Sequence, residues 1–424
     1  MTAAQPQMRG TERRTGPLAA ARLVRTRNFG PYFVGNAVSA SGTWFHNLAA
    51  AILVYRLTGS EVLLGVLNFG QFLPVLVLAP WAGAAADRFD RRRLVLVTQL
   101  VATALAATLA LLAWTAAATP AVVILFSLAL GVTSAFAAPA AQALITSLVA
   151  ADDLASAVGL NSMTYNIARA VGPALAAATV ATLGIPEAFA LNSISYLALV
   201  AGLLVVRPRR AERARRTALA DSLRLLRSEP RLAAFLVVVA LVGFASDPIN
   251  TLAPAFAGEF GRPDTYAGLV IGVFGAGAVF AAIVLAGRVT GSRRRLAVTL
   301  ALLGGGVVLF AITPWLPLAL GVLFAAGFGY LASNTSATSQ LLLGVEEDQR
   351  GRMMALWTVA FLGLRPFASL VDGLIANVYG VRAAGIALAL PALAAAVLVT
   401  VSIRPRFTRR PRGRPSAPSE PARR

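Results

Sequence analysis

Four charged side chains lie inside long apolar stretches of the 424-residue sequence. They are Arg169, Arg365, Asp247 and Asp372. If these stretches cross a bilayer, a central Arg or Asp costs about 2.5–3.5 kcal/mol on insertion scales, so each one indicates a function by default. Two guanidinium groups suit an anionic substrate group, because their planar donors form paired hydrogen bonds with carboxylates and catecholates. The alternative is a structural pair, neutralised by backbone carbonyls or by nearby acids.

The two aspartates have a different chemistry. A buried carboxylate that gains and loses a proton is the usual proton carrier of a coupled transporter, so Asp247 and Asp372 are both candidates for proton coupling. Asp372 follows Arg365 by seven residues, which places the two on one helical face about 10 Å apart along the axis. Asp372 is therefore either an indirect partner of Arg365 or a residue near the membrane boundary.

Uncharged polar residues recur at helical spacing near these charges. They are Asn36, Ser39, Thr43 and Asn47 in the first apolar stretch, Asn161 and Tyr165 before Arg169, Asn250 after Asp247, and Tyr330, Asn334 and Thr338 in the tenth stretch. We expect these residues to line a substrate pathway. The alternative is hydrogen bonding between helices, worth about 0.6 kcal/mol per pair on average. His46 lies beside the polar residues of the first apolar stretch. We predict that its side chain packs against its neighbours and does not relay protons.

The elements that position these residues follow from the composition. Hydrophobic residues make up 57% of the chain, charged residues only 13%, and the mean hydropathy is +0.72. A soluble domain is roughly half apolar and a quarter charged, so this chain has too little polar surface for one. The apolar stretches are about twenty residues long or longer, the length of a membrane-spanning helix. Twelve spans are predicted, at 32–55, 62–84, 94–116, 120–148, 155–183, 187–206, 232–257, 265–287, 296–314, 316–343, 352–379 and 382–403.

The basic residues predict how the spans are oriented. All 38 are arginines, and 33 of them lie in the segments 1–31, 85–93, 207–231, 288–295, 344–352 and 404–424. By the positive-inside rule these segments, and so both termini, are cytoplasmic, which indicates a multi-pass protein of the inner membrane. The net charge of +20 then favours contact with anionic inner-leaflet lipids rather than with nucleic acid.

The apolar spans and the arginine-rich segments divide the chain into five predicted parts. Residues 1–31 form a cytoplasmic arm, 32–206 a six-helix half, 207–231 a linker, 232–403 a second six-helix half, and 404–424 a disordered basic tail. Leu219, Leu223 and Leu226 predict an amphipathic helix within the linker. A shift of 196 residues places Arg169 on Arg365, and a shift of 203 places Asn47 on Asn250. Such a duplicated unit is typical of transporters.

Several classes of function are excluded or disfavoured. The chain has no cysteine and one histidine, which excludes disulfides, thiol catalysis, a histidine-rich metal centre and a Ser-His-Asp triad. The Gly-rich run at 268–280 is followed by no Gly-Lys-Ser/Thr, so it is not a phosphate loop. We therefore predict no enzyme activity, no metal and no cofactor.

One loop carries a family resemblance. The string GAAADRFDRRRL, at 83–94, resembles the loop signature of the major facilitator superfamily, Gly-x-x-x-Asp-Arg-x-Gly-Arg-Arg. Gly83, Asp87, Arg88, Arg91 and Arg92 match it, whereas Asp90 replaces a glycine. The strings RNFGPYFVGNAVSASGTW, YRLTGSEVLLGVL and NIARAVGPALA resemble the branch of enterobactin exporters and macrolide efflux proteins.

The resemblance implies roles for these residues. Asp87 would latch the two halves by meeting the start of the eleventh span, near 350–354, while Arg91 and Arg92 either join this gating loop or only set topology. Gly172 and Pro173 resemble the centre of a span-five motif of drug antiporters and imply a helix kink. The flanking glycines of that motif are alanines here, which weakens the antiporter assignment.

The sequence thus predicts an all-α membrane protein with the twelve-helix major facilitator fold, in two six-helix pseudo-repeats, acting as a monomer. By resemblance it exports a small organic molecule in exchange for protons, by alternating access. The alternatives are an uptake symporter for a metabolite, or a transport-inactive receptor or scaffold with the same fold. Substrate-dependent flux would distinguish these classes.

Overall fold

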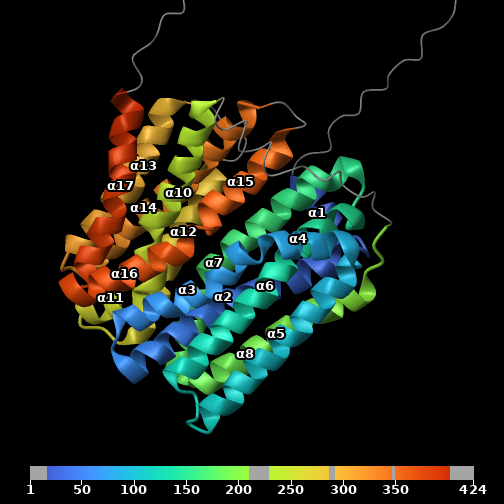
Figure 1. The fold of residues 1–424 in the computed structure, drawn as a ribbon, viewed down its shortest axis with the longest axis horizontal. Coiled ribbons are helices and arrows are strands. Elements are labelled where there is room, and N and C mark those ends of the chain that lie inside the picture. Colours follow the sequence, from blue (N-terminus) through green and yellow to red (C-terminus); the bar gives the residue numbers. More distant parts are fainter. Residues whose placement is uncertain (1–16, 210–228, 286–291, 346–348, 402–424) are drawn as a thin grey trace, which may run out of the picture.

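The computed structural model describes residues 17–209, 229–285, 292–345 and 349–401 (Figure 1). The first sixteen residues of the predicted arm, the predicted linker helix at 219–226 and the predicted tail at 404–424 lie outside the described residues. Every element within the described ranges is helical.

The first group of helices comes from the N-terminal part of the chain. It comprises α1 (Pro17–Val24), α2 (Gly30–Thr58), α3 (Glu61–Val77), α4 (Ala79–Arg88), α5 (Arg91–Trp114), α6 (Pro120–Leu148), the 3₁₀ turn η1 (Ala151–Asp153), α7 (Leu154–Thr182) and α8 (Ile185–Val205). Side-chain oxygens of Ser60, Asp90 and Thr119 cap α3, α5 and α6 by accepting a backbone N–H of the first turn. Asp90, which replaces a glycine of the loop signature, is thus the N-cap residue of α5.

The second group comes from the C-terminal part. It comprises α10 (Pro230–Thr251), α11 (Ala253–Glu259), η2 (Asp264–Tyr266), α12 (Ala267–Leu285), α13 (Arg293–Ile312), α14 (Leu316–Leu343), α15 (Arg350–Leu362), α16 (Arg365–Tyr379) and α17 (Val381–Val401). Figure 1 shows the two groups side by side.

Within the described ranges, ten helices are long and apolar enough to cross a membrane, and an eleventh span results if α3 and α4, bent by 54°, count as one. The fifth predicted span corresponds to α7, which has 29 residues and is therefore about 44 Å long. Its length suffices for a bilayer, but Asn161, Tyr165, Asn166 and Arg169 lower its hydropathy. The predicted number of twelve spans stays a prediction.

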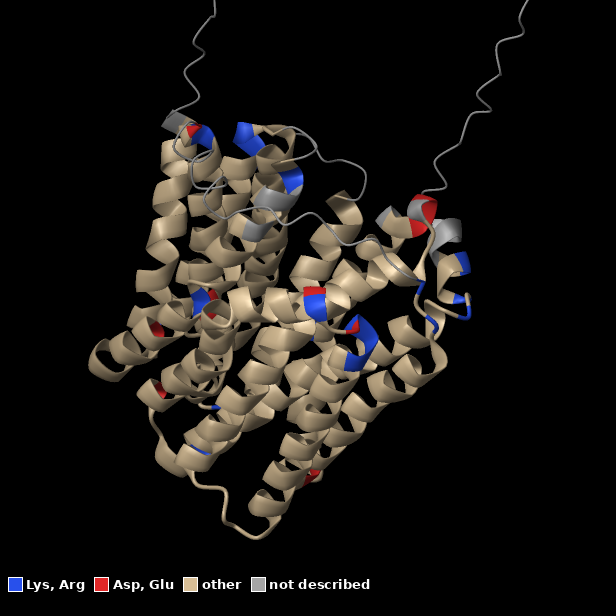
Figure 2. Ribbon diagram, turned by 45° about the vertical axis from the view of Figure 1, so that its right-hand side comes forward, with Lys and Arg blue, Asp and Glu red and all other residues tan. Residues whose placement is uncertain are grey.

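The charged residues divide the bundle into two ends. Figure 2 shows arginines gathered toward the end at which α5, α10 and α13 begin, and we call this the arginine-rich end. The opposite end carries the turns around Gly59 and Gly261, whose φ angles of +60° and +64° suit glycine.

The two groups meet along a seam, where α3 packs on α16 and α7 packs on α12. Glycines allow the close approach. A methyl group on Gly65 of α3 would lie 2.5 Å from the backbone oxygen of Ser369 on α16, and one on Gly275 of α12 would lie 2.6 Å from the Cα of Ala170 on α7. The seam therefore brings backbone against backbone and positions the charged residues of both groups.

Candidate transport site

An ion pair lies at the centre of the site. Arg365 donates from Nε to Oδ1 of Asp247 at 3.3 Å, and the two side chains are only 7% and 1% exposed. Arg365 is the first residue of α16, which begins after a break at 363–364 with Pro366 in its first turn. Asp247 lies one turn before the end of α10. Broken membrane helices of this kind are typical of transporter binding sites.

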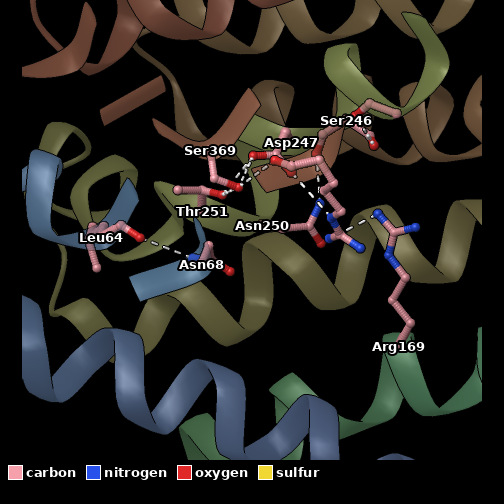
Figure 3. A network of polar contacts seen from close by, with 10 residues as sticks. Leu64, Asn68, Arg169, Ser246, Asp247, Asn250, Thr251 and Ser369 are labelled. Atoms are coloured by element: carbon pink, nitrogen blue, oxygen red, sulfur yellow. Dashed lines mark hydrogen bonds and ion pairs between the residues drawn. The ribbon is translucent and has the colours of Figure 1, made fainter. Parts of the chain in front are cut away.

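Two hydroxyl groups complete the surroundings of Asp247. Ser369 donates to Oδ2 at 2.7 Å, and Thr251 donates to the same oxygen at 2.9 Å. Figure 3 shows Asp247, Ser369 and Thr251 pointing toward one another. Both hydroxyls are buried, so the Asp247 carboxylate accepts hydrogen bonds from three protein groups, those of Arg365, Ser369 and Thr251, in place of water.

Asp372 lies one turn beyond Ser369 and is fully buried. Neither of its carboxyl oxygens has a hydrogen-bond partner among the described residues. Its carboxyl group is near enough to that of Asp247 for the two to interact. Of the two acids, Asp247 is the one that pairs with Arg365. Two neighbouring buried carboxyl groups do not both carry charge at low cost, so the pair can hold a proton.

Arg169 lies on α7 and reaches across the seam. Its Nη2 donates to Oδ1 of Asn250 at 3.4 Å, and its guanidinium lies 4.4 Å from the ring centroid of Tyr330 and 5.5 Å from that of Phe274. It is 3% exposed, and its Nε has no partner among the described residues. Asn250, Phe274 and Tyr330 all belong to the second group. Aromatic faces, not a carboxylate, thus surround this cation.

Trp44 of α2 contacts both arginines. The guanidinium carbons of Arg169 and Arg365 each lie 5.5 Å from its ring centroid. Arg365 also lies 4.4 Å from the ring centroid of Phe72 on α3. Arg169 therefore extends from the first group onto aromatic rings of the second, and Arg365 extends from the second group onto rings of the first. The two arginines thus occupy equivalent positions in the two groups, in agreement with the shift of 196 residues that relates them in the sequence.

A small cavity of about 20 Å³ borders the ion pair. Its polar lining consists of Asn47, Asn68, Asn250 and Arg365, and Trp44 and Phe72 add apolar walls. This volume is on the scale of one water molecule. Arg169 and Arg365 are both buried, so the two groups enclose the central arginines in this conformation.

The other predicted pathway residues divide into pairs within one group. Asn36 donates to Asn161 at 3.0 Å, Ser39 donates to Gln99 at 2.9 Å, and Asn47 accepts from Gln71 at 2.6 Å. Thr43 donates to the backbone oxygen of Ser39, Tyr165 packs edge-on against Trp44, and Thr338 accepts from the indole of Trp357. Thr43 also donates to the hydroxyl of Tyr196 on α8 at 3.5 Å, so Ser39 and Thr43 connect helices of their own group.

Two further polar side chains stand apart. His46 is 2% exposed, neither ring nitrogen has a partner among the described residues, and its ring centroid lies 5.0 Å from that of Phe189. This is the packing environment that we expected. Asn334 keeps its Oδ1 buried without a partner within the described ranges.

The loop signature holds helices of the first group together. Arg92 donates to the backbone oxygens of Leu203 and Leu204 at the end of α8, and Arg91 donates to that of Ala143 on α6. Asp87 is exposed and forms no hydrogen bond or ion pair with the described side chains. The latch between Asp87 and the start of the eleventh span, which the family resemblance implies, stays a prediction. Arg88 is exposed too, and a methyl group on Gly83 would meet open space.

Gly172 and Pro173 lie inside α7, which continues through them as one helix. A methyl group on Gly172 would lie 2.7 Å from the backbone oxygen of Ser41, so this glycine lets α7 approach α2. The backbone oxygen of Pro173 would lie 2.6 Å from a methyl group on Gly268 of α12. Both residues therefore serve close helix packing.

Sequence reasoning missed several residues of the site. Trp44 and Phe72 look like ordinary core aromatics, and Ser369 and Thr251 look like isolated hydroxyls in apolar helices. Two signals were available. The shift of 203 residues places Trp44 on Asp247, and Pro366 directly after Arg365 predicts a helix break there.

Two groups of membrane-spanning helices that meet at a buried, charged seam form a fold that is also found in solved structures of transporters. Among solved structures, a bacterial homologue of the human lysosomal transporter Spinster matches with a TM-score of 0.72 at 14% identity, over 92% of this chain and 97% of the other. The nucleoside transporter NupG also matches with a TM-score of 0.72, at 12% identity, over 91% and 100% of the two chains.

The chain belongs to the transmembrane secretion effector family, whose model matches residues 18–419. It is 31% identical to the staphyloferrin A transporter of Staphylococcus aureus over 40% of this chain and 43% of that one. It is 24% identical to macrolide efflux protein A of Streptococcus pyogenes over 54% and 58% of the two chains. The matches thus span about half the length of these relatives. The expected superfamily is confirmed.

Proposed function

We propose that this protein is a proton-driven exporter of a small organic molecule, working by alternating access in the cytoplasmic membrane with both termini in the cytoplasm. The observation that carries the proposal is the buried carboxyl group of Asp372, near that of Asp247, which pairs with Arg365. Two neighbouring buried acids, of which one is paired with a cation, can take up and release a proton with little rearrangement. The relatives named for macrolide efflux support the direction.

Protonation would change the seam in a defined way. While Asp247 is ionised, it holds Arg365 at 3.3 Å. A proton bound at Asp247 removes this attraction and leaves Arg365 held by Phe72 and Trp44 of the first group. The proton would therefore weaken the contact of Arg365 with Asp247, which lies within the second group. The contact of Arg365 with the first group would remain, and a change in the contacts between the groups is what alternating access requires.

The charge of the substrate determines whether substrate transport is coupled to protons as antiport or as symport. A cationic substrate that binds the carboxyl pair competes with the proton, and this competition produces antiport. An anionic substrate that binds Arg365 leaves Asp247 without its partner and favours proton uptake, and this produces symport. We propose that the exported substrate is neutral or cationic at the carboxyl pair, with Trp44, Phe72 and Tyr330 supplying aromatic contacts.

The test uses everted membrane vesicles energised with a proton gradient. Macrolides, fluorescent cationic dyes and a catecholate siderophore are offered to the wild type, Asp372→Asn, Asp247→Asn and the control Asp152→Asn, which removes an exposed acid. We expect accumulation that a protonophore abolishes, at least tenfold slower in Asp372→Asn and unchanged in the control. Full gradient-driven accumulation by both Asp372→Asn and Asp247→Asn would overturn the proposed coupling.

The same vesicles test the sign of coupling. Addition of a transported cation should release protons from the vesicle lumen, which a pH-sensitive dye reports. Proton uptake together with an anionic siderophore would overturn antiport and favour the symport alternative. Arg169→Ala, compared with the exposed-arginine control Arg294→Ala, shows whether Arg169 contributes to substrate binding.

A further inference from the structure

An apolar groove with a volume of about 650 Å³ opens between α10, α13 and α17, outside the seam. Ala234, Val237 and Leu241 line it from α10, and Pro391, Leu398 and Val399 line it from α17. We propose that this groove binds one acyl chain of an anionic phospholipid, and that Arg231 and Arg293 at its mouth bind the phosphate group. This site is separate from the transport site and does not depend on the proposed function.

The length of the groove fits one leaflet of a bilayer. Its lining on α10 extends from Pro230 to Leu241, a separation of eleven residue steps and therefore about 16 Å along the helix axis. The hydrocarbon core of a bilayer is about 30 Å thick, so one leaflet accounts for about 15 Å. On α17 the lining extends from Val399, near the end of the helix, to Pro391 at its middle. The groove thus runs from the arginine-rich end to about the middle of the membrane.

The lining fits a chain of CH₂ groups. Of the fourteen residues that line the groove in the described part of the chain, all except Arg231 and Arg293 are apolar. The α10 residues at positions 230, 234, 237, 238 and 241 follow the helical period, so they form one continuous face. Val237 is 57% exposed and Leu398 is 65% exposed, which leaves this surface open to a lipid.

The mouth fits a phosphate. Arg231 and Arg293 lie in the first turns of α10 and α13, and both are exposed. Guanidinium groups bind phosphate oxygens through paired, charge-assisted hydrogen bonds. The N-terminus of α10, which no described side chain caps, adds positive helix dipole at the same point. Glu229, which precedes α10, adds an opposing charge at the same point.

This chemistry selects an anionic lipid over a zwitterionic one. A basic pocket between membrane helices at the arginine-rich end attracts a net negative headgroup, whereas phosphatidylcholine brings a cationic choline with its phosphate. The acyl chain packs against the apolar lining in the same way for either lipid, so the two arginines account for the selectivity.

The experiment is native mass spectrometry of the full-length protein, supplied with phosphatidylglycerol or phosphatidylcholine of identical chains. We expect the wild type to retain one phosphatidylglycerol at least fivefold more often than phosphatidylcholine. In Arg231→Gln/Arg293→Gln this preference should fall below twofold. The matched control Arg207→Gln/Arg294→Gln removes two exposed arginines that do not line the groove, and it should keep the preference. Ala394→Trp, which fills the groove, should reduce retention of both lipids.

Three results would overturn the proposal. They are equal retention of both lipids by the wild type, an unchanged preference in Arg231→Gln/Arg293→Gln, and an equal loss in the control. A segment of the chain itself is the competing occupant. Because the chain has no cysteine, a disulfide between Leu223→Cys and Ala234→Cys would report the linker in the groove and would also overturn it.

Discussion

Arg365 and Asp247 lie 118 residues apart in the sequence and form an ion pair in which both side chains are buried, with 3.3 Å between Nε and Oδ1. The pair joins the start of α16 to the end of α10. It connects the cation that lies on the aromatic rings of the first group with the carboxyl pair proposed to carry the proton. The stability of the seam and its response to protonation therefore depend on the same contact.

Removal of one partner of this pair should destabilise the protein strongly. Arg365→Gln leaves Asp247 as a buried charge without its cation, and breaking a buried pair in this way costs about 3–5 kcal/mol. The double variant Arg365→Gln/Asp247→Asn removes both charges and should recover at least 1 kcal/mol of this loss. Unfolding in mixed detergent micelles measures both. Additivity of the two single effects within about 0.5 kcal/mol would contradict the coupling.

Trp44 should couple energetically to Arg169. A desolvated cation over an indole ring is worth about 2 kcal/mol, so a cycle of Trp44→Leu and Arg169→Gln should show a coupling energy of about 1 kcal/mol or more. The matched control is Trp315→Leu, because Trp315 is 64% exposed and is not in contact with the arginine. Its effect should add to that of Arg169→Gln. Additive effects for Trp44 as well would show that the contact contributes no stability.

A second ion pair joins the two groups at the end opposite the arginine-rich one. Arg56 at the end of α2 donates to both carboxylate oxygens of Asp264, at 2.6 and 2.8 Å. The pair is partly exposed, so it contributes about 1 kcal/mol at most. Arg56→Ala should therefore raise the population opened at this end by up to about fivefold. Labelling of the cysteine variant Leu63→Cys measures this opening in an otherwise cysteine-free chain.

The same end offers a control for that experiment. Arg382 donates to Glu259 at 2.7 Å, and this pair lies entirely within the second group. Arg382→Ala should leave the labelling rate within twofold of the wild type, because it removes no contact between the groups. Charge exchange in Arg56→Asp/Asp264→Arg should restore the wild-type rate. Equal labelling in Arg56→Ala and Arg382→Ala would show that the Arg56 pair does not hold this end closed.

Much of the fold could be predicted because hydropathy and length determine membrane helices so directly. The predicted spans coincide with described helices within a few residues, although polar residues lower the hydropathy of α7. The breaks between α3 and α4 and between α15 and α16 could not be derived from hydropathy, since a broken span stays apolar throughout. Prolines at the breaks, such as Pro366, were the signal.

The site was only partly predictable, because periodicity identifies the face of a helix but not the neighbour that it meets. It placed Ser39 and Asn47 on one stripe, yet Ser39 bonds α5 and Asn47 bonds α3. The contact of Asp372 with Asp247 depends on how α16 crosses α10, which sequence spacing does not specify. The internal repeat was more informative, since it paired the two arginines that the structure places on one indole ring.

Glycine at position 65 should be required for the contact between the groups. A methyl group there would lie 2.5 Å from the backbone oxygen of Ser369, and backbone cannot move aside as a flexible side chain does. Gly65→Ala should therefore cost about 1–3 kcal/mol of stability and loosen α3 from α16. Gly373→Ala, whose methyl group would lie 2.6 Å from the backbone oxygen of Glu61, should behave alike.

Gly321 of α14 supplies the matched control, because a methyl group there would meet nothing within 4 Å. Gly321→Ala should leave stability unchanged or raise it by up to about 1 kcal/mol, since alanine restricts the unfolded chain and favours the helix. Thermal unfolding in detergent and the labelling rate of Leu63→Cys compare the three variants. If Gly65→Ala unfolds and labels like Gly321→Ala, α3 and α16 do not approach as closely as described, and Ser369 is free of the constraint that now holds it against Asp247.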